Sequence, residues 1–268
     1  MRYGVCNLAI IPVRKEPSET AEMCTQLLFG EAYQLVEKAG KWIKIATCDC
    51  HYEGWINENQ FNPIHELDVE NYLKSEKYIL KEMLLFIKDF ESNITFPIFI
   101  GSSFPIPKDN MLILGDNIFV IQLPEKQESK PNSLLSEKQY DLLRFASAYL
   151  EAPYLWGGRT PAGIDCSGLV QLAFKSIGIN LPRDASQQVE YGENVDFIME
   201  ANIGDVAFFQ NEEGKVIHTG IIVANGTIMH ASGKVRIDSV DSTGIFNKKL
   251  EQYTHHLRVI KRLITCPS

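Results

Sequence analysis

The residues of this sequence best suited to chemistry are a cysteine and two histidines in its C-terminal half. Cys166 stands in the run "IDCSG" (residues 164–168), where a glycine-rich stretch meets an apolar helical pattern. In the first turn of a helix, free backbone N–H groups and the positive end of the helix dipole favour a thiolate. We therefore expect Cys166 to be a nucleophile, with the same N–H groups placed to hold the oxyanion of a tetrahedral intermediate.

A thiol nucleophile needs a base, and His218 and His230 flank a hairpin signal at Asn225-Gly226. A three-residue loop, 224–226, would pair His230 with Gly220 and put both imidazoles on one face, with Cβ atoms roughly 7–8 Å apart. His218 would then take the thiol proton, and His230 would orient His218. The small Gly220 would leave room for the second imidazole.

Plainer readings of these residue types stay open at this point. A single cysteine at a helix start is usually a packing residue, and sheet histidines are often no more than satisfied core groups. The run "CDCH" (residues 48–51) could bind zinc with Cys6 or Cys24, but its C-x-C spacing favours a reduced pair at a strand end. We expect neither a metal nor a cofactor, and we expect His255 and His256 to lie at the surface.

The elements that must position these groups follow from the hydrophobic pattern. Ser136 and Gln139 form a capping box before an amphipathic helix that ends near Pro153, and a second helix begins at Cys166. The runs 204–209, 218–226 and 227–233 read as strands. Helices followed by an antiparallel sheet predict an α+β domain over residues 134–268.

The N-terminal half has the period of short strands instead. Residues 1–64 alternate apolar and polar side chains around turns and predict a small β-barrel, and residues 65–123 predict a second, more diverged barrel. One run of the second region, "YILKEMLLFI", could equally be helical. Residues 124–133, "PEKQESKPNS", predict a solvated linker.

Composition narrows the class of protein. With 268 residues, 45% hydrophobic and 22% charged, the chain is a folded protein without a run long enough to span a membrane. Its net charge of -8 argues against nucleic acid as a partner. The six cysteines have no disulfide-framework spacing, and no signal peptide is recognisable. We expect a cytoplasmic monomer, or a periplasmic or secreted one if a leader has been removed.

The ordered motifs "YLWGGRTPAGIDCSGLVQLAF", "LPRDASQQ", "GDVAFF" and "HTGIIVANGTIMHASG" resemble the NlpC/P60 family of cysteine peptidases. The two preceding regions resemble bacterial SH3 domains, and the whole arrangement is similar to YkfC-like dipeptidyl-peptidase VI enzymes. The resemblance implies a papain-like fold behind two SH3-like barrels. It also implies cleavage of the γ-D-glutamyl bond to a diamino acid in murein peptides with a free N-terminal L-alanine, releasing L-Ala-γ-D-Glu.

The same resemblance assigns roles to individual residues. It implies a catalytic triad of Cys166, His218 and His230, Tyr154 near the oxyanion site, and substrate contacts at Tyr52, Asp165, Ser167, Asp184 and Glu22. An ammonium group taken out of water needs paired carboxylates, so an acetylated amino terminus would lose this pairing. The first barrel would wall off the cleft at this end.

Two other functions remain in view. A cysteine amidase or acyltransferase can use the same fold, although a histidine as third polar residue is typical of the peptidases. A non-catalytic wall-binding protein would keep the SH3-like domains but not an intact set of nucleophile and base. Whether the diamino acid is diaminopimelate or lysine stays open.

Overall fold

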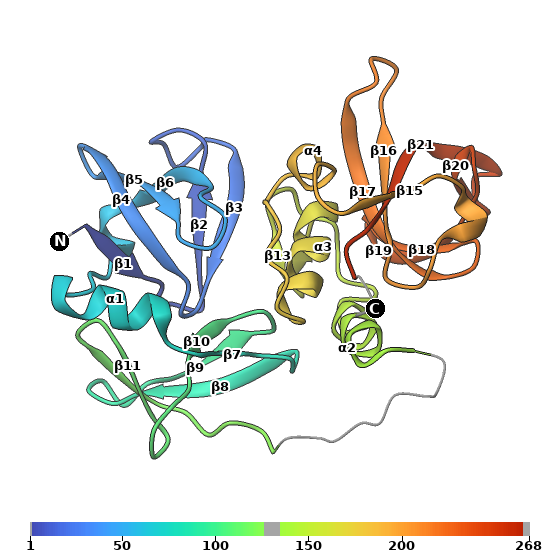
Figure 1. Cartoon of the computed structure of the whole chain (residues 1–268). Helices are drawn as coiled ribbons and strands as arrows, with labels where there is room; N and C mark the ends of the chain where they lie inside the picture. The colour runs from blue at the N-terminus through green and yellow to red at the C-terminus, as the bar shows by residue number, and fades with distance from the viewer. Residues whose placement is uncertain (1, 126–134, 265–268) are drawn as a thin grey trace. The chain divides into compact units, whose positions relative to one another are not determined.

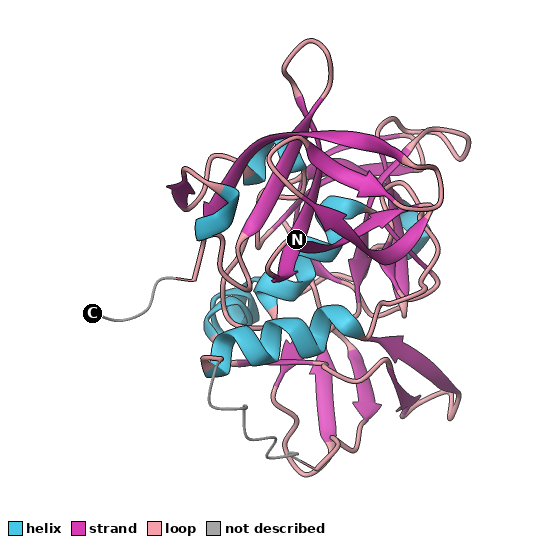
Figure 2. Cartoon of the chain, turned by 90° about the vertical axis from the view of Figure 1, so that its right-hand side faces the viewer, coloured by secondary structure: helices cyan, strands magenta, loops and turns pink. Residues whose placement is uncertain are grey.

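The computed structural model describes residues 2–125 and 135–264, and the chain divides into two compact units. The N-terminal unit comprises residues 1–128 together with 156–160, and the C-terminal unit comprises 129–155 together with 161–268. The chain thus leaves the C-terminal unit after Leu155 and returns to it at Pro161. All but two residues of the expected linker 124–133 lie outside the described residues. In the described part, strands outnumber helices (Figure 2).

The N-terminal unit begins with a six-stranded antiparallel sheet, in the order β1-β4-β5-β6-β2-β3 (Figure 1). Its strands are β1 (Tyr3–Val5), β2 (Ile10–Arg14), β3 (Met23–Leu28), β4 (Ala32–Ala39), β5 (Trp42–Thr47) and β6 (Glu53–Asn57), followed by the 3-10 turn η1 (Glu58–Gln60). Alternate side chains, among them Val13, Tyr33 and Ile45, are fully buried in one core. The period-two pattern of the sequence therefore gives the strands it predicts.

Residues 65–123 form two separate sheets over a second core. A helix that the sequence analysis did not predict, α1 (Glu66–Lys74), precedes them. The strands are β7 (Lys77–Ile79) with β10 (Ser103–Pro105), and β8 (Leu84–Asp89), β9 (Thr95–Phe99), β11 (Met111–Leu114) and β12 (Asn117–Val120). The ambiguous run "YILKEMLLFI" is thus extended. Val5 and Phe29 of the first region pack into the same core as Phe104 and Phe119, so the two regions share buried apolar surface.

The C-terminal unit is helices first and strands after, as expected. Its helices are α2 (Glu137–Ser147), α3 (Cys166–Lys175) and α4 (Ala185–Gln188), with the 3-10 turn η2 (Ile198–Glu200). Ser136 and Gln139 form the predicted capping box of α2. The short strand β14 (Gly163–Ile164) precedes α3, and β13 (Arg159–Thr160) lies just before it in the segment that belongs to the N-terminal unit.

The sheet of this unit closes on itself. Its strands are β15 (Glu193–Val195), β16 (Val206–Gln210), β17 (Val216–Ala224), β18 (Thr227–Ser232), β19 (Lys234–Val240), β20 (Gly244–Asn247) and β21 (Gln252–Arg262). The pairing of β20 with β21 turns β16–β21 into a six-stranded barrel, to which β15 adds through β21. Ala207, Phe209, Ile222 and Ile260 fill one core of this barrel. Helix α3, buried along its whole length, packs against β17 and β18.

The hairpin of β17 and β18 has the predicted register, but its loop is shorter than predicted and one strand contains a bulge. His230 does pair with Gly220, but Ala224 pairs with Thr227, so the loop is the two residues Asn225 and Gly226 and not the predicted three. A bulge between Ile222 and Ala224 supplies the extra residue. The prediction that both imidazoles share a face is confirmed, and the prediction of the loop is wrong.

Candidate active site

Cys166 is the first residue of α3 and is almost fully buried, with 7% of its surface exposed. Asp165 caps the helix, since its Oδ1 accepts a hydrogen bond from the N–H of Gly168 at 2.7 Å. The Cys166 thiol receives a hydrogen bond from the backbone N–H of Thr219. Thr219 follows His218 on β17, so this contact brings the thiol to the strand that carries the base.

The charge state of Cys166 differs from the expectation. Burial, and next the negative charge of Asp165, raise the pKa of Cys166 to about 12, against smaller lowering effects from the Thr219 backbone and Arg183. The expected resting thiolate is therefore wrong, because desolvation outweighs the helix dipole. The resting group is a thiol, and attack requires a base that removes its proton.

His218 and His230 meet as expected. The Nε2 atom of His218 lies 2.8 Å from Nδ1 of His230, and both side chains are buried. A Cβ at Gly220 would lie 2.8 Å from the Cβ of His230, so only glycine leaves room for this ring. Burial, and then the neighbouring His255 and His230, lower the pKa of His218 well below its ordinary 6.5. His218 is therefore a neutral imidazole at neutral pH, which is the form that accepts a proton.

Asp238, which the sequence analysis missed, continues this chain of contacts. Its Oδ2 lies 3.0 Å from Nε2 of His230 and 2.7 Å from Nε of Arg236. Burial would raise the pKa of Asp238, but the hydrogen bonds from His230 and Arg236 outweigh it and lower the pKa. Because a carboxylate accepts only, His230 donates from Nε2 to Asp238 and accepts at Nδ1 from His218. His218 therefore carries its ring hydrogen on Nε2, and its Nδ1 has a lone pair that can accept a proton.

A second missed residue, Arg183, holds the acid beside the nucleophile. Its guanidinium is fully buried and binds Asp165 through two contacts, 3.0 Å to Oδ1 and 2.5 Å to Oδ2. It also donates to Oγ of Ser167 at 2.8 Å. The residues predicted to flank the nucleophile as substrate contacts are therefore part of a buried ionic network.

Tyr154 and Asp184 also lie in the C-terminal unit. Burial, and then the charges of Cys166 and Asp165, raise the pKa of Tyr154 to about 12, so the phenol stays protonated as a hydrogen-bond donor close to the nucleophile. Asp184 holds the N-cap position of α4 without a side-chain capping bond. Since Gln188 of α4 donates to the carbonyl of Ser167 at 3.0 Å, this short helix is tied to the start of α3.

Tyr52 and Glu22 belong to the N-terminal unit. Tyr52 directly precedes β6, and its N–H donates to Oγ1 of Thr47 at 3.1 Å. Glu22 precedes β3, and its Oε1 accepts from the indole N–H of Trp156 at 2.6 Å. Trp156 is one of the five residues that the middle of the chain contributes to this unit, so the indole is a partner that sequence reasoning did not give Glu22.

The segment 156–160 is fixed in the N-terminal unit by a buried ion pair. Arg159 binds Glu31 through two contacts, 2.7 Å from Nη1 to Oε2 and 3.0 Å from Nη2 to Oε1. Its backbone N–H donates to Oε1 of Gln26 at 2.7 Å. A Cβ at Gly157 would lie 2.3 Å from the carbonyl oxygen of Met23, so the backbones touch. Six residues after this anchor, the chain reaches the nucleophile position.

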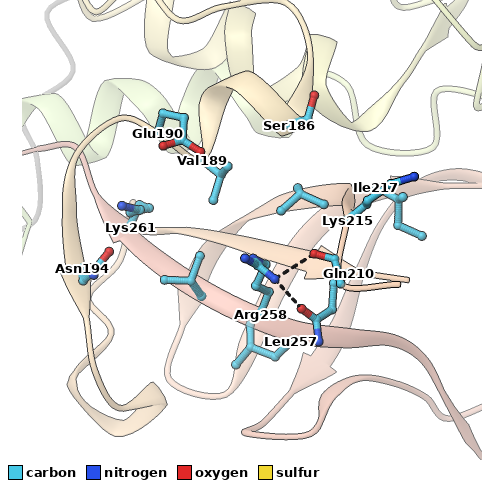
Figure 3. Close-up of a pocket in the computed structure, with 13 residues that line it drawn as sticks. Ser186, Val189, Glu190, Asn194, Gln210, Lys215, Ile217, Leu257, Arg258 and Lys261 are labelled. Atoms are coloured by element: carbon cyan, nitrogen blue, oxygen red, sulfur yellow. Dashed lines mark hydrogen bonds between the residues drawn. The ribbon is translucent and has the colours of Figure 1, made fainter. Parts of the chain in front are cut away.

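A separate groove of about 830 Å³ lies on the C-terminal unit, between α4 and strands β16, β17 and β21 (Figure 3). Arg258 crosses its floor and donates to Oε1 of Gln210 at 2.9 Å and to the carbonyl of Gly214 at 2.7 Å. None of the residues predicted for the active site lines it. The groove is therefore not the site of the cysteine and histidines.

Metal-ligating side chains gather at one place in the described residues. His218, His230 and His255 each offer one ring nitrogen, and these atoms lie within 4.8 Å of one another. The zinc site considered at residues 48–51 does not form such a group; Cys50 instead pairs with Oγ1 of Thr47 at 3.3 Å. The expectation that His255 is a surface residue is wrong, because its ring stacks on that of His218.

A cysteine at the start of a helix, next to the strand that carries one of two hydrogen-bonded histidines, is an arrangement that thiol hydrolases use. Residues 151–255 match the model of the NlpC/P60 family, and residues 13–61 match that of the bacterial dipeptidyl-peptidase SH3 domain. Residues 151–255 are therefore an NlpC/P60 domain, and residues 13–61 are an SH3 domain of the bacterial dipeptidyl-peptidase type. In the described residues, no helix is long and apolar enough to cross a membrane.

Two curated relatives cover much of the chain. A γ-D-glutamyl-L-lysine dipeptidyl-peptidase of Bacillus subtilis is 28% identical over 238 residues, which are 84% of this chain and 78% of the relative. A protein of the same name from Bacillus cereus is 25% identical over 230 residues, 77% of this chain and 66% of the relative. A bifunctional muramidase/DL-endopeptidase of B. subtilis is 43% identical over 94 residues, 34% of this chain and 28% of its own length.

The fold is shared with solved structures. An NlpC/P60 family protein from B. cereus superposes with a TM-score of 0.79 at 17% identity, covering 98% of this chain and all of the other. An NlpC/P60 endopeptidase from Photobacterium damselae superposes with a TM-score of 0.70 at 16% identity, covering 96% of this chain and 70% of the other. Both similarities concern the fold.

Proposed function

We propose that this protein is a cysteine endopeptidase that hydrolyses the γ-D-glutamyl bond to a diamino acid in murein peptides with a free N-terminal L-alanine. The observation that carries the proposal is the hydrogen-bonded chain Asp238–His230–His218, which ends at His218 on β17, the strand whose Thr219 contacts Cys166. The names of the two Bacillus relatives supply the substrate class. The released dipeptide is L-Ala-γ-D-Glu.

The arrangement supports a base-assisted attack. Nε2 of His218 is engaged by His230, so Nδ1 is the nitrogen that takes the proton from the Cys166 thiol. The sulfur then bonds to the γ-carbonyl carbon, and the oxyanion forms near the helix start and the protonated Tyr154. His218 returns the proton to the leaving α-amine of the diamino acid as the C–N bond breaks. Water, deprotonated by His218, hydrolyses the thioester and frees the thiol.

The two acidic residues near the nucleophile, Asp165 and Asp184, have different roles in this proposal. Arg183 already neutralises Asp165, so Asp165 orders the helix start more than it attracts a ligand. Asp184, at the N-cap position of α4, is the proposed partner for the N-terminal ammonium, as the resemblance to the family implies. Tyr52 and Glu22 of the N-terminal unit are the proposed contacts on the amine side.

A direct test offers the full-length protein three peptides. L-Ala-γ-D-Glu-L-Lys, its N-acetylated form and the α-linked isomer L-Ala-α-D-Glu-L-Lys differ only in the amine or the linkage. We expect release of L-Ala-γ-D-Glu, detected by mass spectrometry, from the first peptide alone. Replacing L-Lys by meso-diaminopimelate then ranks the two diamino acids by kcat/KM.

The controls separate the parts of the proposal. Cys166→Ala should abolish release, and release by that variant would remove Cys166 as the nucleophile. Cleavage of none of the peptides would overturn the proposed activity. Equal cleavage of the free and acetylated forms would leave the peptidase but overturn the recognition of a free amine. Cleavage of the α-linked isomer at a similar rate would overturn the γ-glutamyl specificity.

A further inference from the structure

A third imidazole lies against the histidine pair and has no part in the proposed reaction. His255, on β21, stacks on His218 with ring centroids 4.1 Å apart and an angle of 26° between the planes. The His255 and His230 centroids are 5.7 Å apart. His218 and His230 are buried, whereas His255 is half-buried, so this third ring forms the solvent side of the cluster.

The ring nitrogens of the cluster divide between two tasks. His230 contacts Asp238 through Nε2 and turns Nδ1 toward Nε2 of His218, at 2.8 Å. His255 contacts Oγ1 of Thr254 through Nδ1 at 2.9 Å, which leaves its Nε2 as the free donor atom. Each imidazole therefore has one nitrogen that can turn toward a common point, and one nitrogen from each ring already lies within 4.8 Å of the others.

In metal sites, too, one nitrogen of an imidazole binds the metal and the other is held by a polar group. A metal-bound imidazole usually has its other nitrogen fixed by a carboxylate or another polar group, which sets the tautomer and the ring orientation. Asp238 does this for His230, and Arg236 in turn fixes Asp238 with contacts of 2.7 and 2.8 Å. Thr254 does it for His255.

We propose that His218, His230 and His255 form a binding site for a divalent transition-metal ion, of which Zn²⁺ fits three imidazoles best. Tetrahedral zinc with Zn–N bonds of about 2.0–2.1 Å needs nitrogens about 3.4 Å apart. The histidine pair opens slightly from its hydrogen-bond distance, and the ring of His255 turns inward. Water takes the fourth position.

Metal binding would switch off the base, and this consequence rests on the proposed function. The ion bonds to Nε2 of His218 and breaks the hydrogen bond to His230. The hydrogen of that nitrogen moves to Nδ1, so no proton is lost from the ring. A ring that carries hydrogen on Nδ1 and metal on Nε2 has no lone pair for the thiol proton. The site is thus inhibitory and reversible.

Metal binding is tested without reference to activity. The full-length protein carrying Cys48→Ser and Cys50→Ser, which removes the other clustered thiols, is dialysed against Zn²⁺, and the bound metal is counted. Co²⁺ is added in parallel, because tetrahedral cobalt gives an intense visible absorption. We expect one ion per chain and a tetrahedral cobalt spectrum. Binding should weaken at least about tenfold in His255→Ala.

The matched control is His256→Ala, which removes the adjacent exposed histidine on the same strand. It should bind both metals as the parent protein does. Cys166→Ser should also keep the site, because the metal uses the side of His218 that faces His230. Equal binding by His255→Ala and the parent protein, or equal losses in the His255 and His256 variants, would overturn the proposal.

Activity on L-Ala-γ-D-Glu-L-Lys adds the second readout. Zn²⁺ should lower the rate over the range in which one ion binds, EDTA should restore it, and His255→Ala should need about tenfold more Zn²⁺ for the same loss. If one ion binds through His255 and no peptide is cleaved, the metal site stands and the proposed function fails. If the peptide is cleaved and no ion binds, the metal site fails and the proposed function stands.

Discussion

The hydrogen bond from His230 to Asp238 is the contact on which the orientation of the base depends. Asp238→Asn keeps the size of the side chain, but its amide can present N–H to His230 and reverse the tautomer. Because Asp238 acts through two histidines, we expect kcat to fall roughly 10- to 100-fold with KM little changed, at the lower end of the losses seen when proton transfer is impaired. Steady-state kinetics on L-Ala-γ-D-Glu-L-Lys measures both constants.

Asp241→Asn is the matched control for this substitution. Asp241 accepts hydrogen bonds from the N–H of Thr243 and from the hydroxyl of Tyr253, and neither partner belongs to the histidine pair. Its replacement should leave kcat unchanged. A fall in KM and kcat together for Asp238→Asn, or the same fall for Asp241→Asn, would contradict the orienting role of Asp238.

The neutral state of His218 sets the pH dependence of the reaction. Its lowered pKa means that the base stays unprotonated well below pH 6.5, the ordinary value for histidine. We therefore expect kcat/KM, measured with EDTA present, to hold its plateau as the pH falls through 6.5 and to decline only at lower pH. An acid limb centred at or above 6.5 would show that His218 is charged in the resting enzyme.

The sequence predicted the site residues that belong to rare residue types, cysteine and histidine. It did not predict those that belong to common types, aspartate and arginine. Cys166, His218 and His230 stand out because thiols and imidazoles are few, and the register of one hairpin relates the two histidines. Asp238 and Arg183 are ordinary charged residues until burial and distance are known. The pKa of Cys166 was misjudged for the same reason, since the sequence shows a helix start but not how deeply it is buried.

At the scale of elements, the hairpin of β17 and β18 positions the base through a single glycine. A methyl group at Gly220 would press on the Cβ of His230 and on the carbonyl of Met229, both 2.8 Å away. We expect Gly220→Ala to lower the free energy of unfolding by about 1–3 kcal/mol and to lower kcat further than the remaining folded fraction explains. Thermal unfolding and kcat, measured on the same sample, separate these effects.

Gly226→Ala is the comparison within the same hairpin. Gly226 has a φ of 66° at the turn, and a Cβ there would meet nothing closer than 3.6 Å. Its replacement should cost stability through backbone strain, about 1 kcal/mol or somewhat more, with kcat per folded molecule unchanged. Equal kcat for both variants would mean that the His230 ring does not depend on the space at Gly220.

At the scale of elements, the ion pair of Arg159 with Glu31 holds the segment 156–160, and the sequence does not predict it. Arg159→Ala leaves the carboxylate of Glu31 buried without its partner, which typically costs about 3–5 kcal/mol. We expect a lower denaturation midpoint in urea for the full chain. Lys38→Ala breaks an exposed ion pair with Glu58 and should cost at most about 1 kcal/mol. Similar losses of unfolding free energy in the two variants would show that the buried ion pair of Arg159 stabilises the protein no more than an exposed one.

At the scale of the whole molecule, the two units are joined by exchange of chain and not only by a linker. Residues 156–160 belong to the N-terminal unit although their neighbours on both sides belong to the C-terminal unit. Sequence patterns could predict the order of barrels and catalytic domain, because strand and helix periods differ. They could not predict this exchange, since five residues carry no period of their own.

The exchange makes one substitution depend on context. In the full chain, Glu31→Gln removes the charge that Arg159 binds and should cost about 3–5 kcal/mol. In a fragment of residues 1–128, which lacks Arg159, the same substitution should cost distinctly less. Urea unfolding of the four proteins gives this coupling as a double difference. Equal costs in both backgrounds would show that Arg159 and Glu31 do not act together.

The order of synthesis determines when the N-terminal unit becomes complete, because the segment 156–160 is made long after the rest of that unit. A growing chain completes the three sheets of residues 1–123 well before Trp156, Gly157 and Arg159 have been made. Until then Glu31 and Gln26 lack their contacts with Arg159. The last pieces of the N-terminal unit are therefore supplied by the start of the peptidase domain, shortly before Cys166 itself is translated. A nascent chain that stops between the two units would carry an N-terminal domain that cannot yet reach its final stability.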